Sequence, residues 1–473
     1  MLEDLKEIIA IDSVYSEPAP NAPFGVKARA ALDWFLSKSR SYGFNVGELD
    51  GYCGWAEIGD GKRLIGVLCH LDVVPAGEGW TTPPYSMTID GGKIYGRGVA
   101  DDKGALVACM HALKEIKDSG EKLNGRIRII VGCNEENGSA CMKYYASHGE
   151  IPVASIVPDA DFPIINSEKG ILHYLVKVPV DDFFRENIAV LEGGVKDNVV
   201  PDRAVMKIKH GSKLYKYLSG LHEKTAVNGA IGKDILQAMP IVGALVSGGH
   251  ELKDFSVREA GDGLIIETSG IAGHAMEPEK GDNAIWKLFS VLASLHGEFP
   301  SKAVEAIAEN ICTPFACEKL GFAASDEQSG DTTCSLGLIS LSEKTLDLDL
   351  NIRIPVCCNA DTIEGKILSR LPKGSTVETL AFSPNLFVDK DAPLVKTLLK
   401  VYADVTGRET YCVKTGGGTY AKELPGAIAF GPTFPDTVTN LHNADENLPL
   451  TEFEQLKPIY RAAMLALDSA KDI

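Results

Sequence analysis

The sequence has none of the features that mark a membrane-spanning, secreted or nucleic-acid-binding protein. No apolar run is long enough to cross a bilayer, and the charged first residues hold no apolar signal-peptide block. The eleven cysteines show no paired spacing, which favours free thiols in a reducing cytoplasm over a disulfide framework. Basic residues are outnumbered, 47 Lys and Arg against 65 Asp and Glu, and the formal net charge is -18. Because an acidic chain repels phosphate backbones, we expect no nucleic-acid partner. From the missing apolar segments and the free thiols, we expect a cytoplasmic protein without a membrane partner.

The chain also contains no internal repeat and no low-complexity tract. Its 473 residues are too many for one ordinary core, while 45% hydrophobic and 24% charged residues are typical of a globular protein. We therefore expect two domains, or one domain interrupted by another.

The first third of the chain alternates between strand and helix patterns. An apolar run at residues 64–69 precedes a helical period at 102–118, and strand patterns follow at 126–131 and 151–157. This order predicts an α/β domain that begins with residues 1–167, in which helices sandwich a mostly parallel sheet.

The pattern changes near residue 168 and returns near residue 382. Between them we predict strands at 171–180, 204–208, 264–268 and 346–354, and helices at 213–224, 234–246 and 283–296. After residue 382 we predict a helix at 393–405, a Gly-rich turn at 415–418, a strand at 427–431 and a helix at 451–470. Residues 168–381 are therefore predicted to form an α+β domain inserted into the α/β domain, which residues 382–473 complete.

Acidic and histidine side chains follow successive predicted strands, at the point where each strand ends. The residues concerned are His70, Asp72, Asp101, Asp102, Glu135, Glu136 and Asp159. Because open α/β sheets place their sites at the carboxyl ends of parallel strands, we expect these side chains to meet in one crevice. Carboxylates and imidazoles together hold zinc or a similar ion, and a carboxylate beside them can serve as a base.

Each of these residues also has an ordinary structural interpretation. A single histidine at a strand end is more often structural than a ligand, and a Glu-Glu pair usually lies in a solvated loop. Asp101 and Asp102 are suited to cap a helix. Four such groups in one half of the chain are much less frequent by accident, which favours a metal site.

Several segments together are specific enough to indicate a family. Residues 70–77 (HLDVVPAG), 79–86 (GWTTPPYS) and 96–104 (GRGVADDKG) closely resemble the dinuclear-zinc metallopeptidases, as does the Glu135-Glu136 pair. That family includes aminoacylases, desuccinylases, glutamate carboxypeptidases and dipeptidases. Residues 158–163 (PDADFP) resemble its dipeptidase V branch, and the resemblance runs over essentially the whole chain.

The resemblance implies two bound divalent ions, zinc first, with manganese and cobalt also compatible with the ligands. It implies that His70 and Asp159 hold one ion and that Glu136 and His442 hold the other. Asp101 is implied to bridge the two ions and to be followed by a cis peptide bond.

The resemblance also implies roles in catalysis and in substrate binding. Glu135 is implied to be the general base, Asp72 to orient the His70 ring, and His274 to stabilise the oxyanion. The implied substrate-binding residues are Asn198, Arg353, Gly416 and Gly417. The first two resemble a pair that grips a substrate carboxylate, for which the planar fork of arginine is suited.

The inserted block is longer than the lid domain of simpler, dimerising members of the family. The resemblance implies that such an enlarged lid covers its own site, so we predict a monomer. A small pocket that closes over the ions also favours dipeptides as substrates.

The sequence thus predicts a metal-dependent dipeptidase acting on L-dipeptides with a free amino end. The first alternative is an N-acyl amino acid amidohydrolase of the same family, which would more often show the short lid. The second is a metal-dependent binding protein without catalytic activity, disfavoured because every expected catalytic position is occupied. A scaffolding protein would not need this concentration of acids at strand ends.

Overall fold

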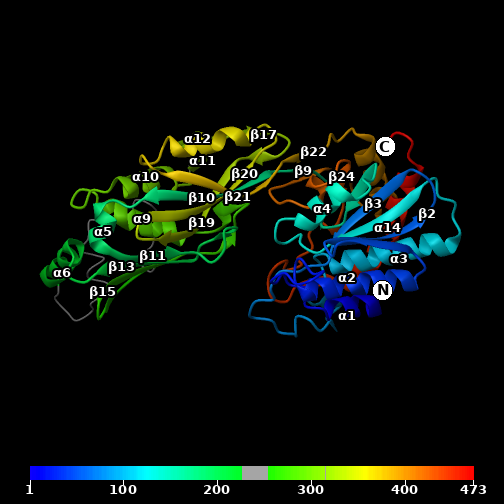
Figure 1. Cartoon of the computed structure of the whole chain (residues 1–473), viewed down its shortest axis with the longest axis horizontal. Helices are drawn as coiled ribbons and strands as arrows, with labels where there is room; N and C mark the ends of the chain where they lie inside the picture. Colours follow the sequence, from blue (N-terminus) through cyan, green and yellow to red (C-terminus); the bar gives the residue numbers. More distant parts are fainter. Residues whose placement is uncertain (226–253, 315) are drawn as a thin grey trace. The chain divides into compact units, whose positions relative to one another are not determined.

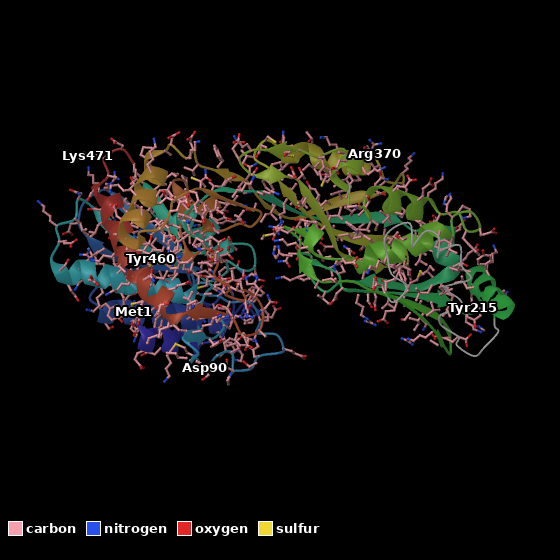
Figure 2. The ribbon with its side chains drawn as sticks, turned by 180° about the vertical axis from the view of Figure 1, so that it is seen from behind. Met1, Asp90, Tyr215, Arg370, Tyr460 and Lys471 are labelled. Carbon is pink, nitrogen blue, oxygen red and sulfur yellow. The ribbon has the colours of Figure 1, made fainter. Side chains whose placement is uncertain are left out.

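The computed structural model describes residues 1–225, 254–314 and 316–473. Contacts divide the chain into two compact units (Figure 1), of which the first comprises Met1–Glu168 and Leu386–Ile473 and the second Lys169–Asn385. Tyr460 in Figure 2 belongs to the first unit, and Arg370 to the second. The helix predicted at 234–246 falls outside the described residues.

The first unit is built on a nine-stranded mixed sheet. Its order is β1-β2-β6-β3-β7-β24-β9-β22, with β23 beside β9. Neighbours run parallel through the centre, from β6 across β3 and β7 to β24, and β23 runs parallel to β9. The strands are β1 (Asn45–Leu49), β2 (Cys53–Gly59), β3 (Leu64–His70), β6 (Arg126–Gly132), β7 (Ala154–Val157), β9 (Ile165–Glu168), β22 (Leu386–Phe387), β23 (Val413–Thr415) and β24 (Ala427–Ala429).

Helices cover this sheet, and their contacts explain the apolar character of its strands. Every residue of β3 is buried, as expected for a central strand that is covered on both faces. The α-helices are α1 (Leu2–Ile9), α2 (Val26–Ser41), α3 (Lys103–Ser119), α4 (Ala140–His148), α13 (Pro393–Thr406) and α14 (Leu450–Ser469). Helices α3 and α14 pack on each other and on β3, whereas α2 and α4 contact β2. The predicted α/β fold with a mostly parallel sheet between helices is confirmed.

Short elements complete the first unit. They are β4 (Thr88–Asp90), β5 (Lys93–Tyr95), β8 (Ala160–Asp161), β25 (Pro432–Thr433), β26 (Asn447–Pro449) and the 3₁₀ turn η4 (Tyr420–Lys422). The strand predicted at 151–157 begins only at Ala154, which follows a segment containing Pro152. Proline cannot donate a hydrogen bond to a sheet, so it is confined to strand edges and strand starts.

The second unit contains an eight-stranded antiparallel sheet in the order β14-β15-β13-β11-β19-β20-β10-β21. Its strands are β10 (Gly170–Pro179), β11 (Ile188–Gly193), β13 (Arg203–Lys209), β14 (Phe255–Ala260), β15 (Gly263–Ser269), β19 (Thr333–Leu341), β20 (Thr345–Ile354) and β21 (Thr376–Ser383). Its helices among the described residues are α5 (Asp182–Asn187), α6 (Lys213–Thr225), α9 (Ala284–Ser294), α10 (Lys302–Asn310), α11 (Ala316–Leu320) and α12 (Ile363–Leu368). Shorter pieces are β12 (Val199–Val200), β16 (Gly273–His274), β17 (Ser325–Asp326), β18 (Gly330–Asp331), η2 (Pro278–Lys280) and η3 (Ala360–Thr362).

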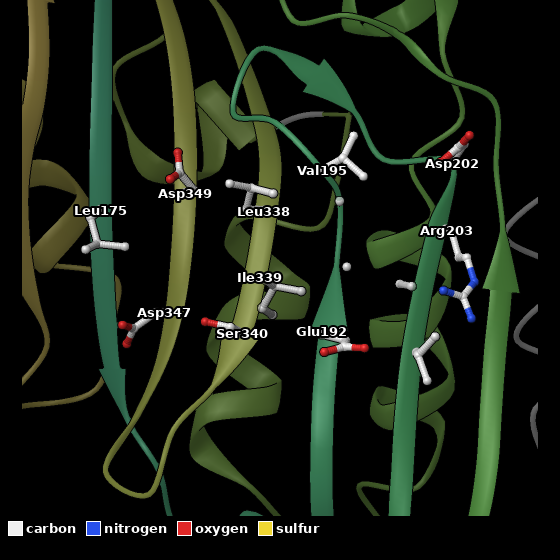
Figure 3. A pocket seen from close by; sticks show the side chains of 14 residues that line it. Leu175, Glu192, Val195, Asp202, Arg203, Leu338, Ile339, Ser340, Asp347 and Asp349 are labelled. Carbon is white, nitrogen blue, oxygen red and sulfur yellow. The ribbon is translucent and has the colours of Figure 1, made fainter. Parts of the chain in front are cut away.

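The two faces of this sheet differ in chemistry. Leu348 and Leu350 of β20 belong to the core that the sheet shares with residues of α9 and α10. In Figure 3 the helices lie behind the strands, and the carboxylates of Asp347 and Asp349 are on the viewer's side. A groove of about 410 Å³ on this face lies across β11 and β19, which pair at only two positions. Its lining includes none of the site residues predicted from the sequence.

Among the described helices, none combines the length and the apolar composition needed to cross a membrane.

Candidate metal centre

The predicted ligands lie at one edge of the first unit's sheet because three neighbouring parallel strands end there. His70 is the last residue of β3, Glu135 and Glu136 follow β6, and Asp159 follows β7. Asp101 lies two residues before α3. Since β6, β3 and β7 are adjacent in the sheet, residues that are far apart in sequence meet at this edge.

The carboxylate of Asp101 lies between two histidines. Its Oδ1 is 2.7 Å from His70 Nε2, and its Oδ2 is 3.0 Å from His442 Nε2. His442 Nε2 is also 3.3 Å from Glu136 Oε2, and His70 Nε2 is 3.6 Å from Asp159 Oδ1. The peptide bond after Asp101 is cis, as the resemblance implies.

Two overlapping groups of side chains have the spacing of metal ligands. One contains His70, Asp101 and Glu136, and the other contains His70, Glu135 and Asp159; within each group the ligand atoms all lie within 4.8 Å of one another. Glu135 therefore stands close enough to be either a ligand or a base beside the ligands.

The electrostatics of this edge also suit cations, because four carboxylates face only two imidazoles. Burial, with the nearby charge of Asp159, raises the pKa of Glu135 well above its usual range. Burial also raises the pKa of Asp159 to about 7, although the neighbouring His70 opposes the shift. Hydrogen bonds to Asp101 and Glu136 raise the pKa of His442 to about 11. Bound divalent ions would relieve this excess of buried negative charge, so the donor set fits a metal centre.

Two aspartates hold the backbone on which the ligands stand. Asp102 Oδ2 accepts a hydrogen bond from the His70 backbone N–H at 3.0 Å. The carboxylate of Asp72 accepts hydrogen bonds from the backbone N–H groups of Glu135 and Glu136, at 3.0 and 3.1 Å. His70 Nδ1 lies 2.9 Å from the Asp72 backbone oxygen and 3.7 Å from its Oδ1. Asp72 thus orients the ring mainly through its main chain, while its side chain anchors the acidic pair.

The second unit brings Asn198 and His274 together. Strand β12 pairs with β16, placing Val199 opposite His274, and the Ala275 backbone N–H donates to the Asn198 backbone oxygen at 2.9 Å. The Met276 backbone N–H donates to His274 Nδ1 at 3.1 Å. This bond leaves the proton of a neutral His274 ring on Nε2.

A chain of polar side chains links Arg353 to the same region. Arg353 Nε donates to Asn351 Oδ1 at 2.8 Å, and Asn351 Nδ2 donates to Asp197 Oδ2 at 3.1 Å. Asp197 directly precedes Asn198. Three residues predicted to contact substrate, Asn198, His274 and Arg353, are therefore connected within the second unit.

The predicted glycine turn belongs to the first unit and lies between β23 and η4. The Gly417 backbone N–H donates to Thr415 Oγ1 at 3.1 Å. At the end of the turn, Thr419 donates from its backbone N–H and its hydroxyl to the buried Glu168, at 3.0 and 2.9 Å. Gly416 and Gly417 thus stand in a turn that is fixed at both ends.

Sequence reasoning missed Arg97 and Glu446, which form an ion pair of 2.7 Å beside the ligands and are each only 1% exposed. The sequence offers only weak indications that these two residues meet. Arg97 stands inside the Gly-Arg-Gly segment, and Glu446 lies four residues after His442, a spacing that does not reveal their contact.

Comparison with known proteins places these observations in a family. The model of peptidase family M20/M25/M40 matches residues 66–466. A Bacillus subtilis protein named "Putative dipeptidase YtjP" is 35% identical over 99% of this chain and 97% of its own length. A Staphylococcus epidermidis protein named "Putative dipeptidase" is 31% identical over 99% of this chain and 97% of its own length.

Solved structures agree in fold. Human carnosine dipeptidase 1 has a TM-score of 0.57 at 16% identity, covering 99% of this chain and 97% of its own. The dipeptidase Dug1p from Saccharomyces cerevisiae also has a TM-score of 0.57, at 15% identity, covering 99% and 96%. With a family model that matches most of its length, this chain belongs to peptidase family M20/M25/M40, a family of metal-dependent hydrolases.

Proposed function

We propose that this protein is a metal-dependent dipeptidase that hydrolyses L-dipeptides in the cytoplasm, as a monomer. The observation that carries the proposal is the Asp101 carboxylate, each of whose oxygens faces a different histidine, His70 or His442. A carboxylate placed in this way would be able to serve two ions. The names of the two bacterial relatives support a dipeptide substrate. The eleven free cysteines suit a reducing compartment.

In the proposed centre, His70 and Asp159 would hold one ion, Glu136 and His442 would hold the other, and Asp101 would contribute to both. Two divalent ions bound there, zinc or alternatively manganese or cobalt, would supply Lewis acidity toward a carbonyl and toward a water molecule.

Glu135 is the proposed general base. It lies beside the ligands, and Asp72 holds its backbone N–H at 3.0 Å. In this role Glu135 takes a proton from the attacking water and passes it to the amine that leaves.

Five further residues are the proposed contacts to the substrate. His274, with its ring proton on Nε2, donates to the oxyanion that develops on the scissile carbonyl. Arg353 and Asn198 bind the carboxylate of the substrate. Asn198 Oδ1 is buried and has no hydrogen-bond partner among the described residues, which is unusual for a buried polar atom and is consistent with a ligand contact there. Gly416 and Gly417 add backbone donors.

Two other functions fit parts of the same site. An N-acyl amino acid amidohydrolase would use the same ions and the same base, with a different acyl group. A binding protein without catalytic activity would keep the ligands and would not need Glu135.

The test is hydrolysis of a panel of L-dipeptides, tripeptides and N-acetyl amino acids with added Zn²⁺ or Mn²⁺, and with a chelator control. We expect chelator-sensitive cleavage confined to dipeptides. Faster cleavage of N-acetyl amino acids would replace the substrate assignment and keep the metal chemistry. Binding of two ions without any cleavage would favour the binding protein.

A further inference from the structure

The buried pair of Arg97 and Glu446 joins the loops that carry the proposed metal ligands. We propose that Glu446 and Arg97 are positioning residues of the metal centre, which set Asp101 and His442 at the separation that two ions require. This inference rests on the proposed dinuclear site and adds two residues that touch neither ion.

Glu446 holds the backbone that leads into Asp101. Its Oε1 accepts the N–H of Ala100 at 2.9 Å and the N–H of Asp101 at 3.3 Å. The N–H of Gly98 lies 3.1 Å from each of its two oxygens. One carboxylate therefore receives three backbone donors, from Gly98, Ala100 and Asp101, in the segment that ends at the proposed bridging aspartate.

The same pair holds the loop that carries His442. Arg97 Nη2 donates to the backbone oxygen of Asn443, the next residue after His442, at 3.2 Å. The backbone oxygen of Glu446 accepts the N–H of Gly96 at 3.1 Å. His442 itself has a φ of 62°, a left-handed conformation that is uncommon for residues other than glycine. Such a conformation persists only where the surrounding contacts impose it.

Arg97 reaches a third loop, which follows His70 and Asp72. Its Nη2 also lies 3.4 Å from the backbone oxygen of Pro75 and 3.2 Å from that of Ala76. The guanidinium lies 5.2 Å from the centre of the Trp80 ring. One ion pair thus gathers three segments that are separate in sequence, and each of them lies next to a proposed ligand.

A buried ion pair is weak evidence for a role in stability, because the cost of desolvation offsets most of the attraction between the charges. What this pair supplies is a defined geometry. Contacts that orient the ligands of a metal commonly change its affinity about 10- to 100-fold when they are removed.

The experiment measures Zn²⁺ affinity in chelator-stripped protein by competition with a chromophoric chelator, alongside the melting temperature of the stripped protein. The variant Glu446→Gln keeps the size of the side chain and removes its charge. The matched control is Glu57→Gln, because Glu57 forms a buried pair with Arg128 in the same unit, at 2.7 Å from Arg128 Nε, and contacts no proposed ligand. We expect Glu446→Gln to weaken at least one Zn²⁺ site about 10- to 100-fold. We expect Glu57→Gln to leave both affinities within about twofold, even if it lowers the melting temperature as much.

Arg97→Lys keeps the positive charge but loses the forked guanidinium that contacts both Glu446 and Asn443. This variant replaces Glu446→Gln in the experiment if Glu446→Gln does not fold. We expect it to bind Zn²⁺ about tenfold more weakly while remaining folded. Unchanged affinity in the folded variants, or an equal loss in Glu57→Gln, would overturn the inference and leave the dinuclear site in place. Wild-type protein that binds no divalent ion would overturn both.

Discussion

At the scale of single residues, Glu135 and Glu136 are neighbouring glutamates with different partners and different proposed roles. The carboxylate of Asp72 accepts hydrogen bonds from both of their backbone N–H groups. The carboxylate of Glu136 faces His442. The carboxylate of Glu135 lies within ligand distance of His70 and Asp159. We predict that Glu135→Gln lowers kcat about 10²- to 10⁴-fold, because the water loses its base. Metal content should stay at two ions per chain, measured by elemental analysis after gel filtration.

The contrast with the neighbouring residue makes this prediction sharp. Glu136→Gln should lose one ion per chain together with its activity, since it removes a proposed ligand. If Glu135→Gln lost an ion as well, Glu135 would be a ligand, and the base would have to be sought elsewhere.

At the scale of elements, β20 carries apolar residues toward the helices and polar residues on its other face. On the polar face Asn351 accepts from Arg353 Nε and donates to Asp197. We predict that Asn351→Ala raises KM about tenfold with little change in kcat, since a hydrogen bond to a charged group is worth about 1.5 kcal/mol. The measurement is steady-state kinetics on a dipeptide and on the same dipeptide with an amidated carboxyl end.

The amidated substrate tests the physical reason, because it lacks the carboxylate that Arg353 is proposed to bind. Its KM should be the same for wild type and for Asn351→Ala. Asp347→Asn, on the same face of β20, is the matched control and should leave KM unchanged for both substrates. An equal rise in KM for both substrates would assign the effect to a general disturbance of the sheet.

The same element shows what could be predicted from the sequence. The strict alternation of residues 346–354 predicted a half-buried antiparallel strand, because the period of two is local information. The antiparallel strand is confirmed, but the half burial is wrong, since every residue from Leu348 to Ile354 is buried, polar side chains included. The ligand positions after β3, β6 and β7 were predictable for a similar reason, since parallel strands bring their carboxyl ends to one edge. These predictions need only the order and type of the elements.

Contacts that depend on loop conformation or on the pairing of distant strands were not predictable. The bond between Asn351 and Asp197 joins residues 154 positions apart. Glu446 meets Arg97 across 349 positions, through loops without regular structure. The family resemblance supplied roles for His274 and Arg353, but not the Asp197 and Asn351 side chains that connect them.

At the scale of the whole molecule, the chain has two separate hydrophobic cores, and we expect metal to stabilise only the unit that holds the ligands. One core comprises buried residues before Glu168 and after Leu386, and the other comprises residues between Leu172 and Leu371. All five proposed ligands belong to the first unit. A ligand that binds only the folded state stabilises that state by mass action, by about 4 kcal/mol at a free concentration 1,000 times Kd.

We therefore predict two calorimetric transitions, of which only one responds to metal. Saturating Zn²⁺ or Mn²⁺ should raise the melting temperature of the first unit's transition by about 10 °C, given about 2–4 °C per kcal/mol for a unit of this size. Chelator should reverse the shift, and His70→Ala should abolish it while leaving the second transition in place. An equal shift of both transitions would mean that the ions act on the whole chain, and an unresponsive protein would contradict the proposed centre.

Light scattering on the same samples tests the predicted monomer, since a dimer would also make the melting temperature depend on protein concentration.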